Sequence, residues 1–280
     1  MLHDTTIAFI GGGNMAAAML QGLLTAGCAP TRLRVSEPDP QRRDALTHRF
    51  PVAIMAENQA VVPGADVVVL AVKPGKVAEV LRTIAPLLMP DVLVLSIAAG
   101  ISLAQLQGML PPGQSVIRVM PNTPALIGAG IAALLPMPAL SMQKRQLAQQ
   151  IMAVTGDVVE VEDESWMDGI TALSGSGPAY LFLVAEALSD GGVACGLPRP
   201  LADRLAVKTL IGSARLIDET GLHPAVLKNQ VTSPGGTTIA GLAQLESAGV
   251  RGALMAAVRA AWERSRALSA GHAEVIPNQQ

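Results

Sequence analysis

The segment that most constrains the fold of this chain is rich in glycine and lies close to the N-terminus. An apolar stretch over residues 5–10 runs directly into Gly11-Gly12-Gly13-Asn14-Met15-Ala16, and a helical pattern continues from Asn14 to Ala26. Gly11, Gly13 and Ala16 satisfy the spacing G-x-G-x-x-G/A between a strand and a helix. In that spacing the first glycine permits a tight turn, the second lets the backbone approach a pyrophosphate, and the third small residue packs the helix against the strand. The segment therefore predicts a dinucleotide-binding turn, with the N–H groups of the helix N-terminus directed at the phosphates.

The rest of the first half alternates between two kinds of segment. Residues 67–72 are apolar at every position, as expected of a strand that is covered on both faces. Further strands are expected at 33–36, 52–55, 92–96, 115–119, 131–135 and 158–161, and helices at 40–48, 58–62, 76–88, 103–110 and 142–154. This alternation predicts an α/β fold with a doubly wound Rossmann sheet.

The second half has a different character. From Glu164 onward no segment has a strand pattern, and helices are expected at 178–189, 198–219, 223–230, 239–247 and 251–268. The segment 178–189 is apolar on almost every side, which is typical of a helix buried in a core or an interface. We therefore predict a dinucleotide-binding Rossmann domain over residues 1–162 and an all-helical domain over residues 163–280.

Composition excludes several classes of protein. The net charge of −2 gives no basic surface for nucleic acid. No apolar run reaches the roughly 18 to 20 residues of a membrane-spanning helix, and the N-terminus lacks the pattern of a signal peptide. Cys28 and Cys195 form no metal or redox motif, which favours a reducing compartment. We expect a cytoplasmic protein without a membrane or nucleic-acid partner.

The choice of cofactor depends on the end of the second strand. Ser36 and Glu37 lie about 20 residues past the glycine turn, where the residue that selects the ribose belongs. Glu37 could accept a hydrogen bond from a ribose 2′-hydroxyl, which favours NAD. Ser36 could instead bind a 2′-phosphate, with Arg42 or Arg43 supplying charge, although these arginines equally fit a solvated helix face. At this level NADH and NADPH both stay open.

Three further segments fall at strand or helix ends. The segment 233–238, Ser-Pro-Gly-Gly-Thr-Thr, precedes a helix, and free N–H groups at Gly236, Thr237 and Thr238 would form a nest for a carboxylate; the alternative is a cap between two helices. The small residues of segment 173–180 either let the second domain approach the nicotinamide closely or form a loop at the domain junction. The segment 120–124 carries an amide and a hydroxyl for a carboxamide, or is a rigid structural turn.

The sequence lacks the groups for demanding acid–base or metal chemistry. None of the four histidines is paired with a carboxylate or cysteine at metal-ligand spacing, and neither a nucleophile elbow nor a catalytic cysteine context is present. His223, before Pro224 at an expected helix start, is interpreted as a capping or surface residue. Hydride delivery to an already electrophilic C=N bond suits such a chain, because the cofactor supplies the hard step.

Five segments, in order along nearly the whole chain, resemble pyrroline-5-carboxylate reductases: 9–15, 71–74, 120–124, 174–180 and 233–238. The resemblance implies reduction of the cyclic imine 1-pyrroline-5-carboxylate to L-proline, the last step of proline biosynthesis, with NADPH as the cofactor and NADH as an alternative. It also implies a homodimer that intertwines through the helical domain, often assembled further into a decamer.

The same resemblance implies the site residues. The cofactor contacts are Ile10, Gly11, Gly12, Gly13, Asn14, Met15, Ser36, Asn58, Ala71, Val72, Lys73, Pro74, Ala98 and Ala99. The substrate site is lined by Glu164, Ser233, Gly236, Thr237 and Thr238. From these positions we expect the Thr238 hydroxyl to form a hydrogen bond with the imine nitrogen. Glu37 is acidic beside the expected 2′-phosphate position, and Gln230 stands where some members carry Asn, so no contact is carried over there.

Two other functions are compatible with a dinucleotide-binding fold. One is a related imine reductase or β-hydroxyacid dehydrogenase, but the segment 178–189 lacks the lysine that the latter enzymes place on the helix after their second glycine motif. The other is a dinucleotide sensor without catalysis, against which the anion nest at Gly236 argues.

Overall fold

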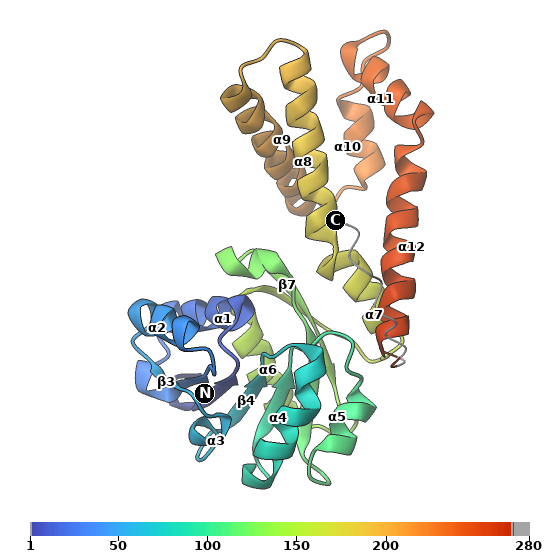
Figure 1. Cartoon of the computed structure of the whole chain (residues 1–280). Coiled ribbons are helices and arrows are strands. Elements are labelled where there is room, and N and C mark those ends of the chain that lie inside the picture. Colours follow the sequence, from blue (N-terminus) through green and yellow to red (C-terminus); the bar gives the residue numbers. More distant parts are fainter. Residues whose placement is uncertain (1, 270, 272–280) are drawn as a thin grey trace. The chain divides into compact units, whose positions relative to one another are not determined.

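The computed structural model describes residues 2–269 and residue 271, which form two compact units (Figure 1). The first unit contains residues 2–175 and the described C-terminal residues from Ala261 on, and the second unit is Ser176–Ala260. In the part of the chain that the structure describes, no helix is both long and apolar enough to cross a membrane.

The first unit is built on one eight-stranded sheet with the strand order β3-β2-β1-β4-β5-β6-β7-β8. All neighbouring strands are parallel except β6 and β7, which are antiparallel. The strands are β1 Ile7–Ile10, β2 Leu33–Ser36, β3 Ala53–Met55, β4 Val67–Leu70, β5 Leu93–Ser96, β6 Ser115–Met120, β7 Gly130–Pro136 and β8 Gly156–Glu160. The predicted doubly wound sheet is confirmed. Because β1 lies between β2 and β4, the glycine turn that follows β1 lies at the point where the strand order reverses, where such sheets bind ligands.

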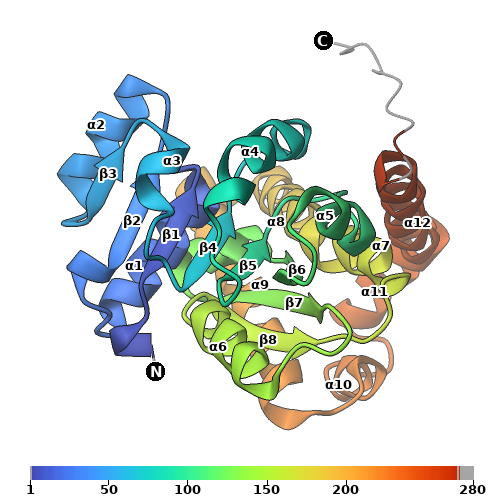
Figure 2. The ribbon, with the colours of Figure 1, turned by 90° about the horizontal axis from the view of Figure 1, so that it is seen from below.

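Helices cover both faces of this sheet (Figure 2). Ile7 and Phe9 of β1 belong to one apolar cluster, and Ala8 and Ile10 belong to another, because successive side chains of a strand point to opposite faces. The first cluster is completed by α1 Asn14–Thr25, α2 Pro40–Arg49 and α6 Met142–Ala153. The second is completed by α3 Asn58–Val61, α4 Val77–Ile84, α5 Leu103–Met109 and α7 Trp166–Ile170.

Short helical turns account for most differences from the expected bounds. The helix expected over 76–88 is α4 flanked by the 3-10 turns η3 Pro74–Lys76 and η4 Ala85–Leu87, because Pro86 has no N–H to continue the α-helix. The other short turns are η1 Leu2–Asp4, η2 Pro30–Arg32, η5 Thr123–Ile127 and the π-helical turn η6 Thr171–Gly175.

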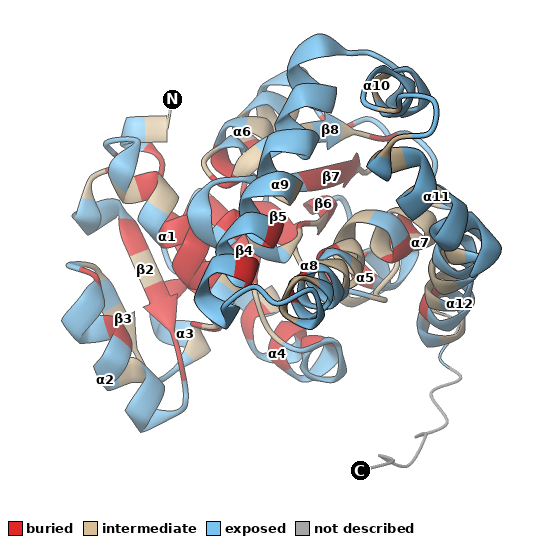
Figure 3. Cartoon of the chain, turned by 90° about the horizontal axis from the view of Figure 1, so that it is seen from above, coloured by how far each residue is buried: buried red, intermediate tan, exposed pale blue. Residues whose placement is uncertain are grey.

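The second unit is helical, as predicted. It contains α8 Gly177–Ala194, α9 Arg199–Thr220, α10 Pro224–Gln230, α11 Thr237–Ser247 and the first part of α12 Val250–Ser269. Few of its residues are buried: α9 buries only Ala202 and Ala206, and α10 and α11 bury none, whereas buried residues gather in the sheet (Figure 3). The large apolar side chains of Leu181, Phe182 and Leu183 on α8 are exposed.

The division between the units lies after the last strand rather than at it. α7 stays with the first unit because Met167 is fully buried in the second sheet cluster. The turn after α7 is held by the Asn122 side-chain amide, which donates to the carbonyl of Ser174. The first compact unit therefore continues to Gly175, although the last strand of the sheet ends at Glu160.

Candidate functional site

The first half of the glycine turn is closely confined by its neighbours. Gly11 has φ +100°, and a Cβ on it would lie 2.6 Å from the carbonyl oxygen of Ala71. Its N–H donates to the carbonyl of Ser36 at 2.9 Å, and the Ala71 N–H donates to the carbonyl of Ile10 at 2.8 Å. The turn is thus held between the ends of β2 and β4, and only glycine combines this φ with so close an approach.

The second half of the turn is open. Gly13, the N-cap of α1, has an ordinary φ of −70°, and a Cβ on it would meet no atom within 4 Å. No side chain caps α1, so its first N–H groups lack partners within the helix. A cavity of about 390 Å³ beside the turn is lined by Gly12, Gly13, Asn14, Ala17, Arg42, Ala45, Leu46 and Arg49. Open backbone, unpaired N–H groups and two guanidinium groups fit the phosphates of a dinucleotide.

Gly12 has a function that the sequence pattern did not reveal. A Cβ on this residue would collide with Leu46 of α2 and would lie 3.3 Å from Cβ of Glu37. Gly12 therefore lets the second strand and α2 pack closely against the turn. The buried third small residue, Ala16, packs α1 onto the sheet as the pattern predicted.

The end of β2 holds the residues that were expected to select the cofactor. Ser36 is fully buried, and its hydroxyl donates to Oδ1 of Asn58 at 2.8 Å, which fixes the orientation of that carboxamide. The Glu37 carboxylate is also buried and accepts hydrogen bonds from the N–H groups of Gly12 and Asp39, both at 3.1 Å. The Arg43 guanidinium donates to the carbonyls of Glu37 and Pro38.

The ends of β4 and β5 carry the other expected cofactor contacts. Ala71 and Val72 are half-buried and lie against Gly11, where Cγ1 of Val72 is 3.1 Å from the position of a Gly11 Cβ. Lys73 and Pro74 are exposed, and the Lys73 carbonyl accepts from the N–H of Lys76. At the end of β5, Ala98 is buried and Ala99 is exposed. Segment 71–74 is therefore adjacent to the glycine turn, while 98–99 follows the next strand of the sheet.

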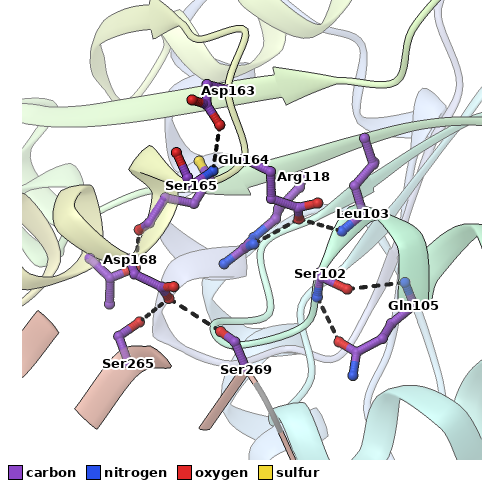
Figure 4. A network of polar contacts seen from close by, with 12 residues as sticks. Ser102, Leu103, Gln105, Arg118, Asp163, Glu164, Ser165, Asp168, Ser265 and Ser269 are labelled. Carbon is purple, nitrogen blue, oxygen red and sulfur yellow. Dashed lines mark hydrogen bonds and ion pairs between the residues drawn. The ribbon is translucent and has the colours of Figure 1, made fainter. Parts of the chain in front are cut away.

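Glu164, expected in the substrate site, is part of a polar network in the first unit (Figure 4). Its Oε1 accepts from the Arg118 guanidinium at 2.9 Å and from the N–H of Leu103, the first residue of α5, at 2.6 Å. The Arg118 side chain is 4% exposed and that of Glu164 is 37% exposed. Glu164 thus neutralises a buried cation and satisfies a helix N-terminus, a structural role that the sequence did not show.

In a second part of the same network, the C-terminal helix α12 is hydrogen-bonded to α7. Oδ1 of Asp168 accepts from the hydroxyls of Ser265 and Ser269 at 2.6 and 3.2 Å (Figure 4). These bonds attach the last turns of α12 to α7 within the first unit.

Asn122, a candidate for binding a carboxamide, has both ends of its side chain engaged. Its Nδ2 donates to Ser174 and its Oδ1 accepts from the N–H of Ile131 at 3.0 Å. The geometry supports the alternative of a structural turn for this segment.

The segment before α11, in the second unit, is the candidate carboxylate site. Gly235 has φ +68°, and Gly236 is the N-cap, where a Cβ would collide with the Ser233 hydroxyl. The expectation of a free N–H at Gly236 is wrong, because that group donates to the carbonyl of Ser233 at 3.1 Å. No side chain caps α11, so the N–H groups of Thr237 and Thr238 lack partners within the helix. Thr237 is exposed and Thr238 is half-buried.

The histidines have structural contacts. Nδ1 of His223 accepts from the N–H of Ala225 and caps α10, as predicted, while His3 and His48 contact backbone carbonyls. His272 lies outside the described residues. Among the residues that the structure describes, no group of three or more His, Cys, Asp or Glu side chains could hold a metal ion.

Two family models match the chain. Residues 164–268 match the model described as pyrroline-5-carboxylate reductase dimerisation, and residues 6–100 match an NADP oxidoreductase model described as coenzyme F420-dependent. The chain is 46% identical to the pyrroline-5-carboxylate reductase of Synechocystis over 94% of its length and 97% of that protein. It is 39% identical to that of Pseudomonas aeruginosa over 94% of its length and 96% of that protein.

Solved structures give the same result. The chain is similar to a pyrroline-5-carboxylate reductase from Coxiella burnetii with a TM-score of 0.88 and 36% identity, covering 95% of this chain and 98% of that one. It is similar to the Plasmodium falciparum pyrroline carboxylate reductase with NADP bound, with a TM-score of 0.86 and 31% identity, covering 95% of this chain and 99% of that one.

Proposed function

The chain belongs to the pyrroline-5-carboxylate reductase family, and from that premise we propose that it reduces 1-pyrroline-5-carboxylate to L-proline with NAD(P)H. The structural observation that carries the proposal is the contrast within the glycine turn. Gly11 is confined by the backbone of Ala71, whereas Gly13 faces open space at the start of α1. Such a turn binds a dinucleotide, and the identity of the substrate is inferred from the family.

The residues of the first unit bind and orient the cofactor. The N–H groups at the start of α1 bind the pyrophosphate, with Arg42 and Arg49 adding positive charge from the side of α2. The exposed segment from Lys73 and the small residues Ala98 and Ala99 lie past the ends of β4 and β5, where the remaining part of the dinucleotide binds in such sheets. When bound, the nicotinamide supplies a hydride to the C=N carbon of the substrate.

The residues before α11 bind the substrate. The N–H groups of Thr237 and Thr238, which have no partner within the helix, donate hydrogen bonds to the substrate carboxylate, and the positive end of the helix dipole adds to its binding. Ser233 and Gly236 shape this turn. Glu164, in the first unit, is proposed as a further substrate contact, and its Oε1 already accepts from Arg118 and Leu103.

Thr238 contacts the reacting bond. Bound as the iminium, the substrate already carries the proton that balances the incoming hydride, so no strong general acid is needed. The Thr238 hydroxyl accepts a hydrogen bond from the iminium N–H and holds the ring in one orientation. Most of the rate enhancement then comes from proximity and orientation.

A direct assay tests the reaction. Purified protein is mixed with 1-pyrroline-5-carboxylate and with NADH or NADPH in parallel, and the loss of cofactor absorbance is followed together with the formation of proline. Oxidation of at least one cofactor, in equal amount to proline formed, is expected. Tight cofactor binding with oxidation of neither would contradict the proposal and would favour a dinucleotide sensor.

The role of Thr238 has its own test. Thr238→Ala is expected to lower kcat/KM for the imine roughly tenfold or more, since it removes an interaction with the reacting group. Thr238→Ser should retain most of the activity. The matched control is Thr232→Ala, because the Thr232 hydroxyl donates to the carbonyl of Lys228 in α10. An unchanged kcat/KM in Thr238→Ala would show that the hydroxyl has no such role.

We also propose that the chain forms a homodimer through its helical unit, and that dimers assemble further into decamers. The exposed apolar side chains on α8, α9 and α11 need a covering surface. A second copy of the chain supplies it, in line with the dimerisation model that matches residues 164–268. The proposed location is the cytoplasm, where the free thiols of Cys28 and Cys195 would stay reduced.

A further inference from the structure

We propose that Glu37 makes this enzyme select NADH over NADPH. The proposal rests on the proposed function and names the cofactor that the same site prefers. Glu37 follows β2 directly and therefore occupies the position that meets the adenosine ribose in dinucleotide-binding sheets.

Both oxygens of the Glu37 carboxylate are held by backbone N–H groups. One oxygen accepts from the N–H of Gly12 inside the glycine turn, and the other accepts from the N–H of Asp39 at the start of α2. Glu37 is only 5% exposed, and its Cβ lies 3.3 Å from the position of a Gly12 Cβ. The side chain cannot swing out to make room for a phosphate without breaking both bonds and disturbing the turn.

The groups that could bind a 2′-phosphate at the end of β2 are engaged elsewhere. The Ser36 hydroxyl is fully buried and donates to Asn58. The Arg43 guanidinium donates to the carbonyls of Glu37 and Pro38, so it braces the backbone of the same loop. Neither group offers the 2′-phosphate a ligand without giving up a bond in the fold.

Two other cations lie nearby. Arg42 and Arg49 line the cavity beside the glycine turn together with Gly12, Gly13 and Asn14. Gly13 and Asn14 are at the start of α1, so these guanidinium groups border the place where the pyrophosphate binds. We assign them to the pyrophosphate that NADH and NADPH share, so they do not distinguish the two cofactors.

The two cofactors therefore interact differently with Glu37, because they differ in charge at the ribose 2′ position. A ribose 2′-hydroxyl donates a hydrogen bond to a carboxylate, whereas a phosphate monoester carries about −1.5 to −2 charges at neutral pH and repels it. Burial strengthens this repulsion, since the effective dielectric constant near a protein is well below that of water.

The test measures binding and therefore does not depend on turnover. Dissociation constants of NADH and NADPH are determined by fluorescence titration for the wild type, Glu37→Gln and Glu37→Ser. For the wild type, the Kd of NADPH should exceed that of NADH at least tenfold. In Glu37→Gln, which keeps the size of the side chain, the ratio should fall at least fivefold, and Glu37→Ser should bring it near or below one.

Two controls separate this effect from others. Asp44→Asn removes one exposed negative charge on α2 and should leave the ratio unchanged. Arg42→Ala should weaken both cofactors to a similar extent. Wild-type protein that binds NADPH as tightly as NADH, an unchanged ratio in Glu37→Gln, or a loss confined to NADPH in Arg42→Ala would each overturn the proposal. If neither cofactor is oxidised by the imine, the proposed reaction fails, but the binding ratio still tests Glu37.

Discussion

At the scale of single residues, Gly11 and Gly13 have different surroundings within one turn, so the same substitution should affect them differently. Gly11→Ala places a Cβ at a φ of +100° and 2.6 Å from the Ala71 carbonyl oxygen. We expect it to lower the free energy of unfolding by about 1–3 kcal/mol from the backbone strain alone, with a further cost from the contact. Chemical denaturation measures this loss.

Gly13→Ala is the matched variant in the same turn. Its Cβ would meet no protein atom within 4 Å, so the free energy of unfolding should change by less than about 0.5 kcal/mol, in the usual range of surface substitutions. Cofactor binding should nevertheless weaken, because the new methyl group occupies the space that the pyrophosphate needs. Equal stability losses in the two variants, or unchanged cofactor affinity in Gly13→Ala, would contradict this account.

Glu164 is expected to matter for stability as well as for the substrate. Glu164→Ala leaves the buried Arg118 guanidinium and the N–H of Leu103 without their acceptor. We expect a loss of about 1–3 kcal/mol in the free energy of unfolding, measured in urea without ligands. Glu162→Ala, two residues earlier and exposed, is the control and should have little effect. A fully stable Glu164→Ala variant would show that the bonds of Glu164 to Arg118 and Leu103 contribute nothing to stability.

At the scale of elements, α2 shows how a cap makes stability depend on pH. The Asp39 carboxylate accepts from the N–H of Arg42, and this backbone hydrogen bond holds the pKa of Asp39 below its usual value. The cap therefore stabilises the fold fully above the unfolded pKa of about 3.9, and the contribution is lost as the pH falls through the lower folded pKa.

Two variants of Asp39 test this dependence. Asp39→Ala should be less stable than the wild type at pH 7, and the difference should shrink as the pH falls toward 3, as followed by urea unfolding across that range. Asp39→Asn keeps a capping side chain that does not titrate and should stay close to the wild type at pH 7. A difference between Asp39→Ala and the wild type that is constant across the range would show that the charge of the cap has no part in stability.

At the scale of the whole molecule, the helical unit exposes many large apolar side chains and buries few residues. Phe182 on α8 is 66% exposed beside Leu181 and Leu183. Phe182→Glu should therefore weaken self-association, and light scattering should show a shift from a mass of at least twice 28.8 kDa toward the monomer. Met142→Glu, which changes an equally exposed residue in the sheet unit, should leave the mass unchanged. A monomeric wild type would contradict the proposed dimer.

The sequence by itself predicted the strands, the order of the helices and a dinucleotide-binding glycine turn, because these depend on local periodicity and on the steric freedom of a few small residues. It could not show that Glu37 bonds the N–H of Gly12, that Glu164 bonds Arg118 or that Asn122 braces a turn. Those contacts join residues that are far apart in the chain, so only the packing of β2 on β1 and of α7 on the sheet brings them together. The same reason explains the return of α12 to the first unit at Asp168. The N–H of Gly236 is different, because it is engaged by a local turn that ends on the carbonyl of Ser233, three residues earlier.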